Sequence, residues 1–227
     1  MKVVLVLPSF NAARTLRRTW EAIPKDCADE IILVDDASTD ETVAIAEGIT
    51  GLHVIRHPEN RGYGANQKTC YTEALKRGAD IVVMLHPDFQ YDPSRVPHMI
   101  EPIASGNADM VIGSRFLQSD PRTGGMVWWR YYGNRFLTTL QNGILKTRLS
   151  ECHSGYRAYS RVLLQSVPYH TFSDRFAFDS QMISATARRK FSIAEVAIPA
   201  RYLSDSSSIS FAQSVRYGAS TLLTLFP

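Results

Sequence analysis

The chain has 227 residues, of which 44% are hydrophobic and 21% are charged, a composition typical of a globular protein rather than of a disordered or fibrous one. The formal charge of +3 comes from scattered Lys and Arg residues, which argues against nucleic acid as a partner. No segment reaches the roughly 18 uninterrupted apolar residues that a membrane-spanning helix needs, and Pro8 and Asn11 interrupt the short apolar run at the N-terminus. Three widely separated cysteines without redox or zinc-ligand spacing fit a reducing compartment, so we expect a cytoplasmic protein.

The first half of the sequence alternates between short apolar runs and helical patterns. The runs predict strands at residues 2–7, 30–34, 53–56, 80–85 and 109–112. The segments between them predict helices at residues 12–23, 40–48, 65–77 and 93–104. Strands that are apolar on both faces and separated by helices are typical of a parallel sheet that is covered on both sides. We therefore expect one α/β domain, residues 1–227, with a Rossmann-like and mostly parallel central sheet flanked by helices.

Beyond residue 115 the pattern changes to two helices, predicted at residues 127–146 and 176–189, and a late strand at residues 193–202. In the first of these helices, large apolar side chains recur on one face and polar side chains lie on another. The apolar face comprises Trp129, Tyr132, Phe136, Leu140 and Ile144, and the polar one comprises Arg130, Asn134 and Gln141. Such an apolar face either packs on the sheet or, with Trp and Tyr beside Arg, lies on a bilayer surface as a peripheral contact. The residues alone leave both interpretations open.

Polar residues follow the predicted strands at their carboxyl ends, where open α/β sheets bind their ligands. Asp35 and Asp36 follow the second strand, and Asp88 follows the fourth. A carboxylate at such a position can accept hydrogen bonds from a nucleobase or a ribose, or it can simply favour the positive end of the next helix. Asp88 is also our first candidate for a metal ligand, because Mg²⁺ needs only one or two protein carboxylates once a diphosphate supplies further oxygens. For His86 we consider three roles: a ligand that favours Mn²⁺, a donor to a phosphate oxygen, or a structural histidine.

These motifs occur in the order found in family 2 glycosyltransferases of the GT-A fold, which the chain resembles over nearly its whole length. The shared segments are residues 8–11, 34–42, 60–66, 88–90 and 113–116. The later sequence Ser154-Gly155-Tyr156-Arg157 is similar to a segment of dolichol-phosphate mannose synthase and related polyprenyl-phosphate glycosyltransferases. Where the family usually has Asp-x-Asp, this chain has His86-Pro87-Asp88, which leaves the identity of the metal open.

The resemblance implies a role for each matching residue. The donor nucleotide would lie against Pro8, Phe10, Asn11, Asp35, Asp36 and Asn66, with Asp36 holding the base. Asp88 and Gln90, together with His86, would bind Mg²⁺ or Mn²⁺ at the donor diphosphate. Arg115 would stabilise the charge of the leaving group or of the acceptor, and Asp179 would be the base, with Asp174 in reserve. An acceptor phosphate would meet Arg130, Asn134, Arg157 and Arg201.

Together these features predict a metal-dependent, inverting glycosyltransferase that uses a UDP- or GDP-sugar. Residues 1–115 would bind this nucleotide-sugar donor and residues 116–227 the acceptor. We favour a polyprenyl phosphate at the inner face of the membrane as the acceptor, with a hydroxyl of a glycan, lipid or protein as the alternative. Two rivals come from other classes. A nucleotidyltransferase would require a Gly-rich loop with a Lys after the first strand, and a degenerate nucleotide-sugar-binding protein would bind the donor without turnover.

Overall fold

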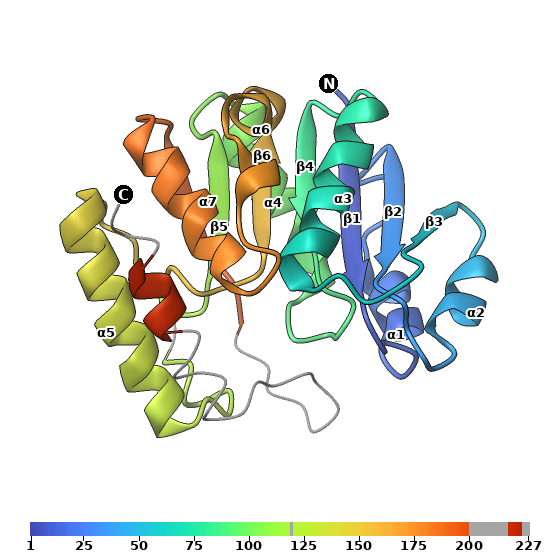
Figure 1. Ribbon diagram of the computed structural model, residues 1–227, viewed down its shortest axis with the longest axis horizontal. Helices are drawn as coiled ribbons and strands as arrows, with labels where there is room; N and C mark the ends of the chain where they lie inside the picture. Colours follow the sequence, from blue (N-terminus) through green and yellow to red (C-terminus); the bar gives the residue numbers. More distant parts are fainter. Residues whose placement is uncertain (119, 200–217, 224–227) are drawn as a thin grey trace.

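A seven-stranded sheet with helices on both faces organises the chain in this computed structural model, which describes residues 1–118, 120–199 and 218–223 (Figure 1). The strands are β1 (Val3–Ser9), β2 (Glu30–Asp35), β3 (Leu52–Arg56), β4 (Ile81–Met84), β5 (Met110–Ser114), β6 (Arg157–Ser160) and β7 (Ile193–Ala197). Their order across the sheet is β3-β2-β1-β4-β6-β5-β7. Neighbouring strands are parallel except around β6, which is antiparallel to both β4 and β5. The prediction of a mostly parallel α/β sheet is confirmed.

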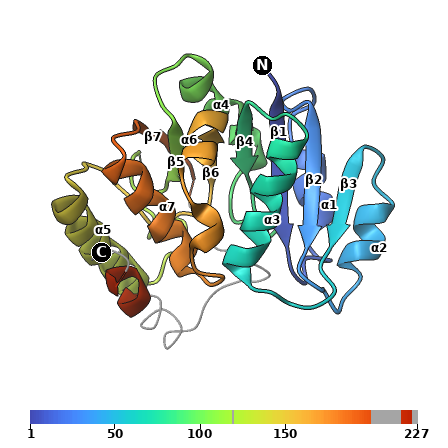
Figure 2. The same cartoon turned by 45° about the horizontal axis from the view of Figure 1, so that its top comes forward.

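Different helices cover the two faces of the sheet, because successive side chains of a strand point to opposite sides. The helices are α1 (Leu16–Ala22), α2 (Thr42–Glu47), α3 (Tyr63–Lys76), α4 (Val96–Ala104), α5 (Trp128–Leu145), α6 (Arg161–Ser166) and α7 (Ala177–Arg188). In β1, Val4 and Val6 belong to a core shared with α3, α6 and α7, whereas Leu5 and Leu7 belong to one shared with α1, α2 and α4. Figure 2 shows α3, α6 and α7 side by side on one face. Burial from both sides explains why β1 is a continuous apolar run in the sequence.

The structure departs from the predicted elements in three places. The sequence did not predict β6 or α6, because β6 has only four residues and begins with a charged arginine. Because β6 lies between β4 and β5, these two strands are not neighbours in the sheet. The first helix begins at Leu16 rather than at residue 12, since the backbone N–H of Ala12 donates to Thr42 Oγ1 (2.7 Å) and the chain turns before the helix starts. The predicted late strand ends at Ala197, and its last residues, 200–202, lie outside the described residues.

Helix α5 presents its large aromatic side chains to solvent. Trp128, Tyr132 and Phe136 are 69%, 59% and 64% exposed, and they recur every four residues along one face. The buried side chains of the helix are instead polar, Thr138 and Gln141. Figure 1 shows α5 at one end of the molecule, next to the short helix at residues 218–223. Of the predicted apolar face, Tyr132 and Phe136 are exposed, whereas Trp129, Leu140 and Ile144 are partly buried, so the face is divided between solvent and the rest of the protein.

The turn that leads into α3 requires glycine at two positions. Gly62 has a φ of +101°, and a Cβ at this position would lie 2.6 Å from the carbonyl oxygen of Asp174. A Cβ at Gly64 would lie 2.2 Å from the carbonyl oxygen of Ser173. The start of α3 therefore packs directly on the segment that precedes α7, and Tyr63 is held between the two helices. The predicted turn at residues 60–64 is therefore shorter than expected, because α3 already begins at Tyr63.

Candidate active site

The loops after β1 and β2 are joined to each other at the carboxyl edge of the sheet. The backbone N–H of Asn11 donates to Ser38 Oγ (2.8 Å), and the Asn11 side-chain oxygen accepts from the backbone N–H of Thr39 (2.9 Å). Asn11 has a φ of +51°, a conformation that Asn tolerates better than most residues. Phe10 lies beside this junction with its ring half exposed, while Pro8 is buried. Of the residues expected to line a nucleotide pocket, Phe10 and Asn11 are therefore the accessible ones.

The Asp36 carboxylate is engaged in hydrogen bonds within the protein. Its oxygens accept hydrogen bonds from the backbone N–H groups of Arg61 (2.9 Å) and Gly62 (2.8 Å), and Oδ1 lies 2.7 Å from Nδ1 of His57. The neighbouring Asp35 accepts from the backbone N–H and the hydroxyl of Ser38. Both carboxylates are buried. In this geometry the pair braces the loops around the site, and Asp36 has little capacity left for a nucleobase.

Asn66 serves the same framework. Its side-chain amide donates to the carbonyl oxygens of Ser9 (3.2 Å) and Val34 (2.9 Å), so it ties the ends of β1 and β2 to α3. The side chain is 3% exposed. Its position supports the pocket from behind rather than lining it.

The turn after β4 presents Asp88 at the sheet edge. Asp88 and Gln90 are partly exposed, and Asp88 Oδ1 accepts from the backbone N–H of Gln90 (3.0 Å). Between them, Phe89 has a φ of +58°, and its buried ring lies beneath the guanidinium of Arg18, 3.9 Å from the ring centroid. Thr15 also donates to the carbonyl oxygen of Pro87 (2.6 Å). Contacts from Arg18 and Thr15 thus hold the turn, in which Phe89 has an unfavourable backbone conformation, and the turn places Asp88 at the edge of the site.

His86, Tyr63 and Asp179 form a cluster that links β4, α3 and α7, in which Asp179 is buried and the two rings are partly buried. The Tyr63 and His86 rings stack with centroids 5.3 Å apart, and the Tyr63 hydroxyl lies 3.2 Å from His86 Nε2. The same hydroxyl donates to Asp179 Oδ2 (2.7 Å). Burial, together with the nearby Asp179 charge, raises the pKa of Tyr63 well above its ordinary value, so the phenol keeps its proton. Gly155 closes the cluster from behind, because a Cβ there would lie 3.0 Å from His86 Nε2.

His86 is neutral and already engaged. Burial lowers the pKa of its imidazole, although the charges of Asp88 and Asp179 oppose the shift. The ring also stacks on Tyr63, with Nε2 3.2 Å from the Tyr63 hydroxyl. Of the three roles considered for His86, the structural one agrees best with these contacts.

Arg157 supports Asp179 from inside the fold. Its guanidinium is fully buried, donates to the carbonyl oxygens of Ser154 (2.9 Å), Asp179 (2.8 Å) and Cys152 (3.1 Å), and lies 3.8 Å from Asp179 Oδ1. Gln67 Nε2 donates to the same carboxylate oxygen (3.2 Å). An arginine with no exposed surface does not reach an acceptor, so we assign Arg157 to the framework of the site.

Arg115 is held by a carboxylate that sequence reasoning missed. Glu151 is fully buried and accepts from the backbone N–H of Arg115 (2.8 Å), from its Nε (3.0 Å) and Nη2, and from the side-chain amide of Asn134 (2.8 Å). Burial alone would raise the pKa of Glu151, but the Arg115 guanidinium more than offsets this effect, and the pKa lies below its ordinary value. Arg115 and Asn134 therefore share Glu151 as a hydrogen-bond partner.

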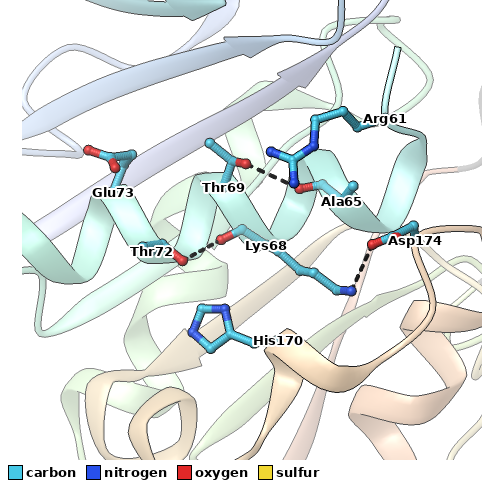
Figure 3. Close-up of a pocket in the computed structure, with 8 residues that line it drawn as sticks. All are labelled: Arg61, Ala65, Lys68, Thr69, Thr72, Glu73, His170 and Asp174. Atoms are coloured by element: carbon cyan, nitrogen blue, oxygen red, sulfur yellow. Dashed lines mark hydrogen bonds and ion pairs between the residues drawn. The ribbon is translucent and has the colours of Figure 1, made fainter. Parts of the chain in front are cut away.

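The remaining predicted residues lie apart from this cluster. The Arg130 guanidinium lies over the ring of Trp129, 4.9 Å from its centroid, and Arg201 is outside the described residues. Asp174, the reserve base, binds the ammonium of Lys68 (2.8 Å) at the rim of a groove of about 420 Å³ along the outer side of α3 (Figure 3). None of the other predicted site residues lines this groove.

Three residues of the site carried no signal that sequence reasoning used. Tyr63 lies within the recognised turn before α3, but nothing marked its side chain as facing β4 and α7. Glu151 and His153 precede the Ser154-Gly155-Tyr156-Arg157 segment in a loop without periodicity. Burial lowers the pKa of His153 to about 4, so this imidazole is also neutral. Only contacts between distant segments identify these residues.

The fold as a whole is similar to that of solved glycosyltransferases. Glucosyl-3-phosphoglycerate synthase from Mycobacterium tuberculosis, in a crystal structure with Mn²⁺, UDP and glucosyl-3-phosphoglycerate, superposes with a TM-score of 0.76 at 23% identity. The alignment covers 99% of this chain and 78% of that one. The fold is the GT-A fold of glycosyltransferases.

The sequence comparison agrees with the fold. The chain belongs to glycosyl transferase family 2, whose profile matches residues 4–167. Among its relatives, a UDP-N-acetylglucosamine–dolichyl-phosphate N-acetylglucosaminyltransferase of Methanococcus voltae is 26% identical over 88% of this chain and 86% of its own length. An undecaprenyl-phosphate mannosyltransferase of Micrococcus luteus is 27% identical over 87% of this chain and 83% of its own length. The protein is thus a hexosyltransferase, as the sequence motifs predicted.

Proposed function

We propose that this glycosyltransferase moves a sugar from a UDP- or GDP-sugar to a polyprenyl phosphate. The observation that carries the choice of acceptor is the surroundings of Asp179, the carboxylate best placed to act as a base. Asp179 is only 7% exposed, and its two oxygens already accept from Tyr63 and Gln67. Such a carboxylate is poorly suited to remove a proton from a hydroxyl, whereas a phosphate acceptor brings its own negative oxygen. The two relatives named for dolichyl phosphate and undecaprenyl phosphate support the same acceptor class.

In the proposed reaction, an acceptor phosphate oxygen attacks the anomeric carbon while the bond from that carbon to the donor diphosphate breaks. The nucleoside diphosphate leaves with the bonding electrons, and attack from the opposite side inverts the anomeric configuration. The half-exposed Phe10 and the neighbouring Asn11 would contact the nucleoside at the end of β1. The Arg115 guanidinium would stabilise negative charge at the diphosphate or the acceptor phosphate.

The residues present fit a metal that is completed by the substrate. Asp88 and Gln90 are partly exposed residues of the same turn, and their carboxylate and amide oxygens are the types of ligand that Mg²⁺ and Mn²⁺ accept. The described residues contain no group of three or more His, Cys, Asp or Glu side chains suited to a metal ion. Donor diphosphate oxygens would therefore supply the missing ligands. When bound, the ion would supply charge stabilisation at the departing diphosphate. The Mn²⁺ and UDP bound to the Mycobacterium tuberculosis enzyme support this proposal.

Binding measurements test this metal site without an acceptor. We expect UDP or GDP to raise the melting temperature only when Mg²⁺ or Mn²⁺ is present, because a ligand that binds the folded state stabilises it. Asp88→Asn should abolish the metal-dependent part of that shift. Asp92→Asn is the matched control, since Asp92 lies four residues away and its carboxylate caps the turn before α4. Equal shifts in wild type and Asp88→Asn would refute the assignment.

We also propose that the aromatic face of α5 contacts the membrane surface that carries the acceptor. None of the helices in the described parts of the chain is long and apolar enough to span a bilayer. Trp128, Tyr132 and Phe136 project from α5 beside the basic side chain of Arg135, a combination that suits the interface between head groups and acyl chains. The same helix carries Asn134, one of the predicted acceptor contacts. We expect Trp128→Ser with Phe136→Ser to weaken binding to anionic vesicles, whereas Val162→Ser, an apolar residue on α6 that is 60% exposed, should not.

The acceptor is tested by the product and by Asp179. Purified enzyme with detergent-solubilised polyprenyl phosphate should release nucleoside diphosphate and form a sugar-phosphate lipid, whereas the corresponding polyprenol should not react. Asp179→Asn should reduce kcat by less than about tenfold if the acceptor is a phosphate. A general base contributes roughly 10² to 10⁴ in rate. A loss of that size, together with transfer to the polyprenol, would refute the proposed acceptor.

A further inference from the structure

Glu151 occupies a central position on the acceptor side of the site. We propose that it is a positioning residue, which fixes Arg115 and Asn134 relative to each other so that both contact the acceptor in one geometry. This inference rests on the proposed function for the identity of the acceptor. The arrangement of the three side chains on which it rests is independent of that function.

The contacts of Glu151 come from two separate elements. Arg115 directly follows β5, and Asn134 lies in α5, nineteen residues further along the chain by number. The Glu151 carboxylate accepts from the Arg115 backbone and guanidinium and, through Oε1, from Asn134 Nδ2 (2.8 Å). Asn134 Oδ1 in turn accepts from Thr138 Oγ1 (3.1 Å), which fixes the orientation of the amide. The buried Glu151 carboxylate therefore fixes the position of Arg115, at the end of β5, relative to Asn134 on α5.

Glu151 also changes the charge of the region. Its carboxylate is ionised next to Arg115, because the guanidinium keeps its pKa low, and the two charges offset each other. A site that attracted phosphate through net charge alone would be weakened by this carboxylate. A site that recognises phosphate through the fixed directions of its donors would be strengthened, because a planar guanidinium binds oxyanions with defined geometry. The two views predict opposite changes in the affinity for a phosphate acceptor when the negative charge of Glu151 is removed.

The loop that carries Glu151 is fixed by other contacts, and these provide matched controls. Glu195 on β7 accepts from the backbone N–H groups of Ser150 (2.8 Å) and Glu151 (3.1 Å) and from the Ser150 hydroxyl (2.6 Å). Asn142, two turns after Asn134 on α5, donates to the carbonyl oxygen of Leu149 (2.8 Å) and accepts from its N–H (3.0 Å). Glu195→Gln and Asn142→Ala thus disturb the same loop and the same helix without removing a contact to Arg115.

Steady-state kinetics with a UDP- or GDP-sugar and a soluble polyprenyl phosphate tests the proposal. We expect Glu151→Gln and Asn134→Ala to raise the acceptor KM by tenfold or more and to leave the donor KM within about twofold of wild type. Glu151→Asp should recover part of the loss. The controls Glu195→Gln and Asn142→Ala should change the acceptor KM by less than about twofold. A lower acceptor KM in Glu151→Gln, or an equal rise in the controls, would overturn the proposal.

Amide hydrogen exchange gives a readout that needs no activity. Both Glu151→Gln and Asn134→Ala should speed exchange in α5 around residues 130–138, whereas Glu195→Gln should not. Unchanged exchange in α5 in both variants would also overturn the proposal. If the wild-type enzyme transfers no sugar to any polyprenyl phosphate, the proposed function fails, and the exchange data still decide the role of Glu151. Should Glu151→Gln fail to fold, Asn134→Ala tests the same link from the helix side.

Discussion

Replacing Asp36 with Asn separates a structural role from nucleotide recognition. In either orientation of the Asn side chain, its amide nitrogen would face a backbone N–H, that of Arg61 or that of Gly62, which would lose its acceptor. A hydrogen bond to a charged group contributes about 1.5 to 3 kcal/mol, so we expect the free energy of unfolding to fall by about that amount. Asp36→Ala would remove all three contacts, and the resulting loss would approach the whole unfolding free energy of a domain, which is roughly 5 to 15 kcal/mol. Asn is therefore the informative substitution.

The assay combines denaturant unfolding with calorimetric titration of UDP and GDP in the presence of metal. Asp35→Asn is the matched control, because the Asp35 carboxylate accepts from Ser38, whose hydroxyl can rotate to accept from an amide. We expect that control to cost about 1 kcal/mol or less. Nucleotide affinity in Asp36→Asn should stay within about threefold of wild type. Unchanged stability combined with a tenfold loss of nucleotide affinity would refute the reasoning and would show that Asp36 holds the base.

Two further predictions concern pH and packing. Because the folded-state pKa of His153 is about 4 and its ordinary value is 6.5, the unfolded chain takes up a proton below pH 6.5 that the folded protein does not. Stability should therefore fall by up to roughly 3 kcal/mol between pH 6.5 and pH 4, and His153→Gln should flatten this part of the curve in denaturant titrations at each pH. Parallel curves of unfolding free energy against pH for wild type and His153→Gln would contradict this prediction. Gly155→Ala should lower the free energy of unfolding by about 1 to 3 kcal/mol, since its Cβ would press on His86 and the Tyr63 hydroxyl. Gly143→Ala on α5, where a Cβ meets nothing within 4 Å, should stabilise by about 0.5 to 1 kcal/mol, and equal effects on melting would count against this view of the cluster.

The local parts of the fold could be predicted from the sequence. The sequence predicted six of the seven described strands and missed β6. Burial on both faces explains the continuous apolar runs of β1, β4 and β5. The order of the motifs after those strands indicated the family and the edge of the sheet where the ligand would bind. Asp88 was predicted from its position, since the carboxyl ends of parallel strands meet at one edge, whereas the role of Phe10 came from the family resemblance.

The tertiary structure decided which polar groups remain available and which face of α5 points outward. Asp36, Asn66 and Arg157 carry the expected residue types, but their hydrogen bonds are taken by segments between 20 and 60 residues away or by their own loop. Glu151 became visible only when β5 and α5 were brought to the same loop. Periodicity identified an amphipathic helix at residues 127–146, but the pattern does not say which face of the helix is buried and which is exposed. Contacts between distant segments decide the orientation, because buried donors and acceptors need hydrogen-bond partners. On the polar side of α5, Asn134 donates to Glu151.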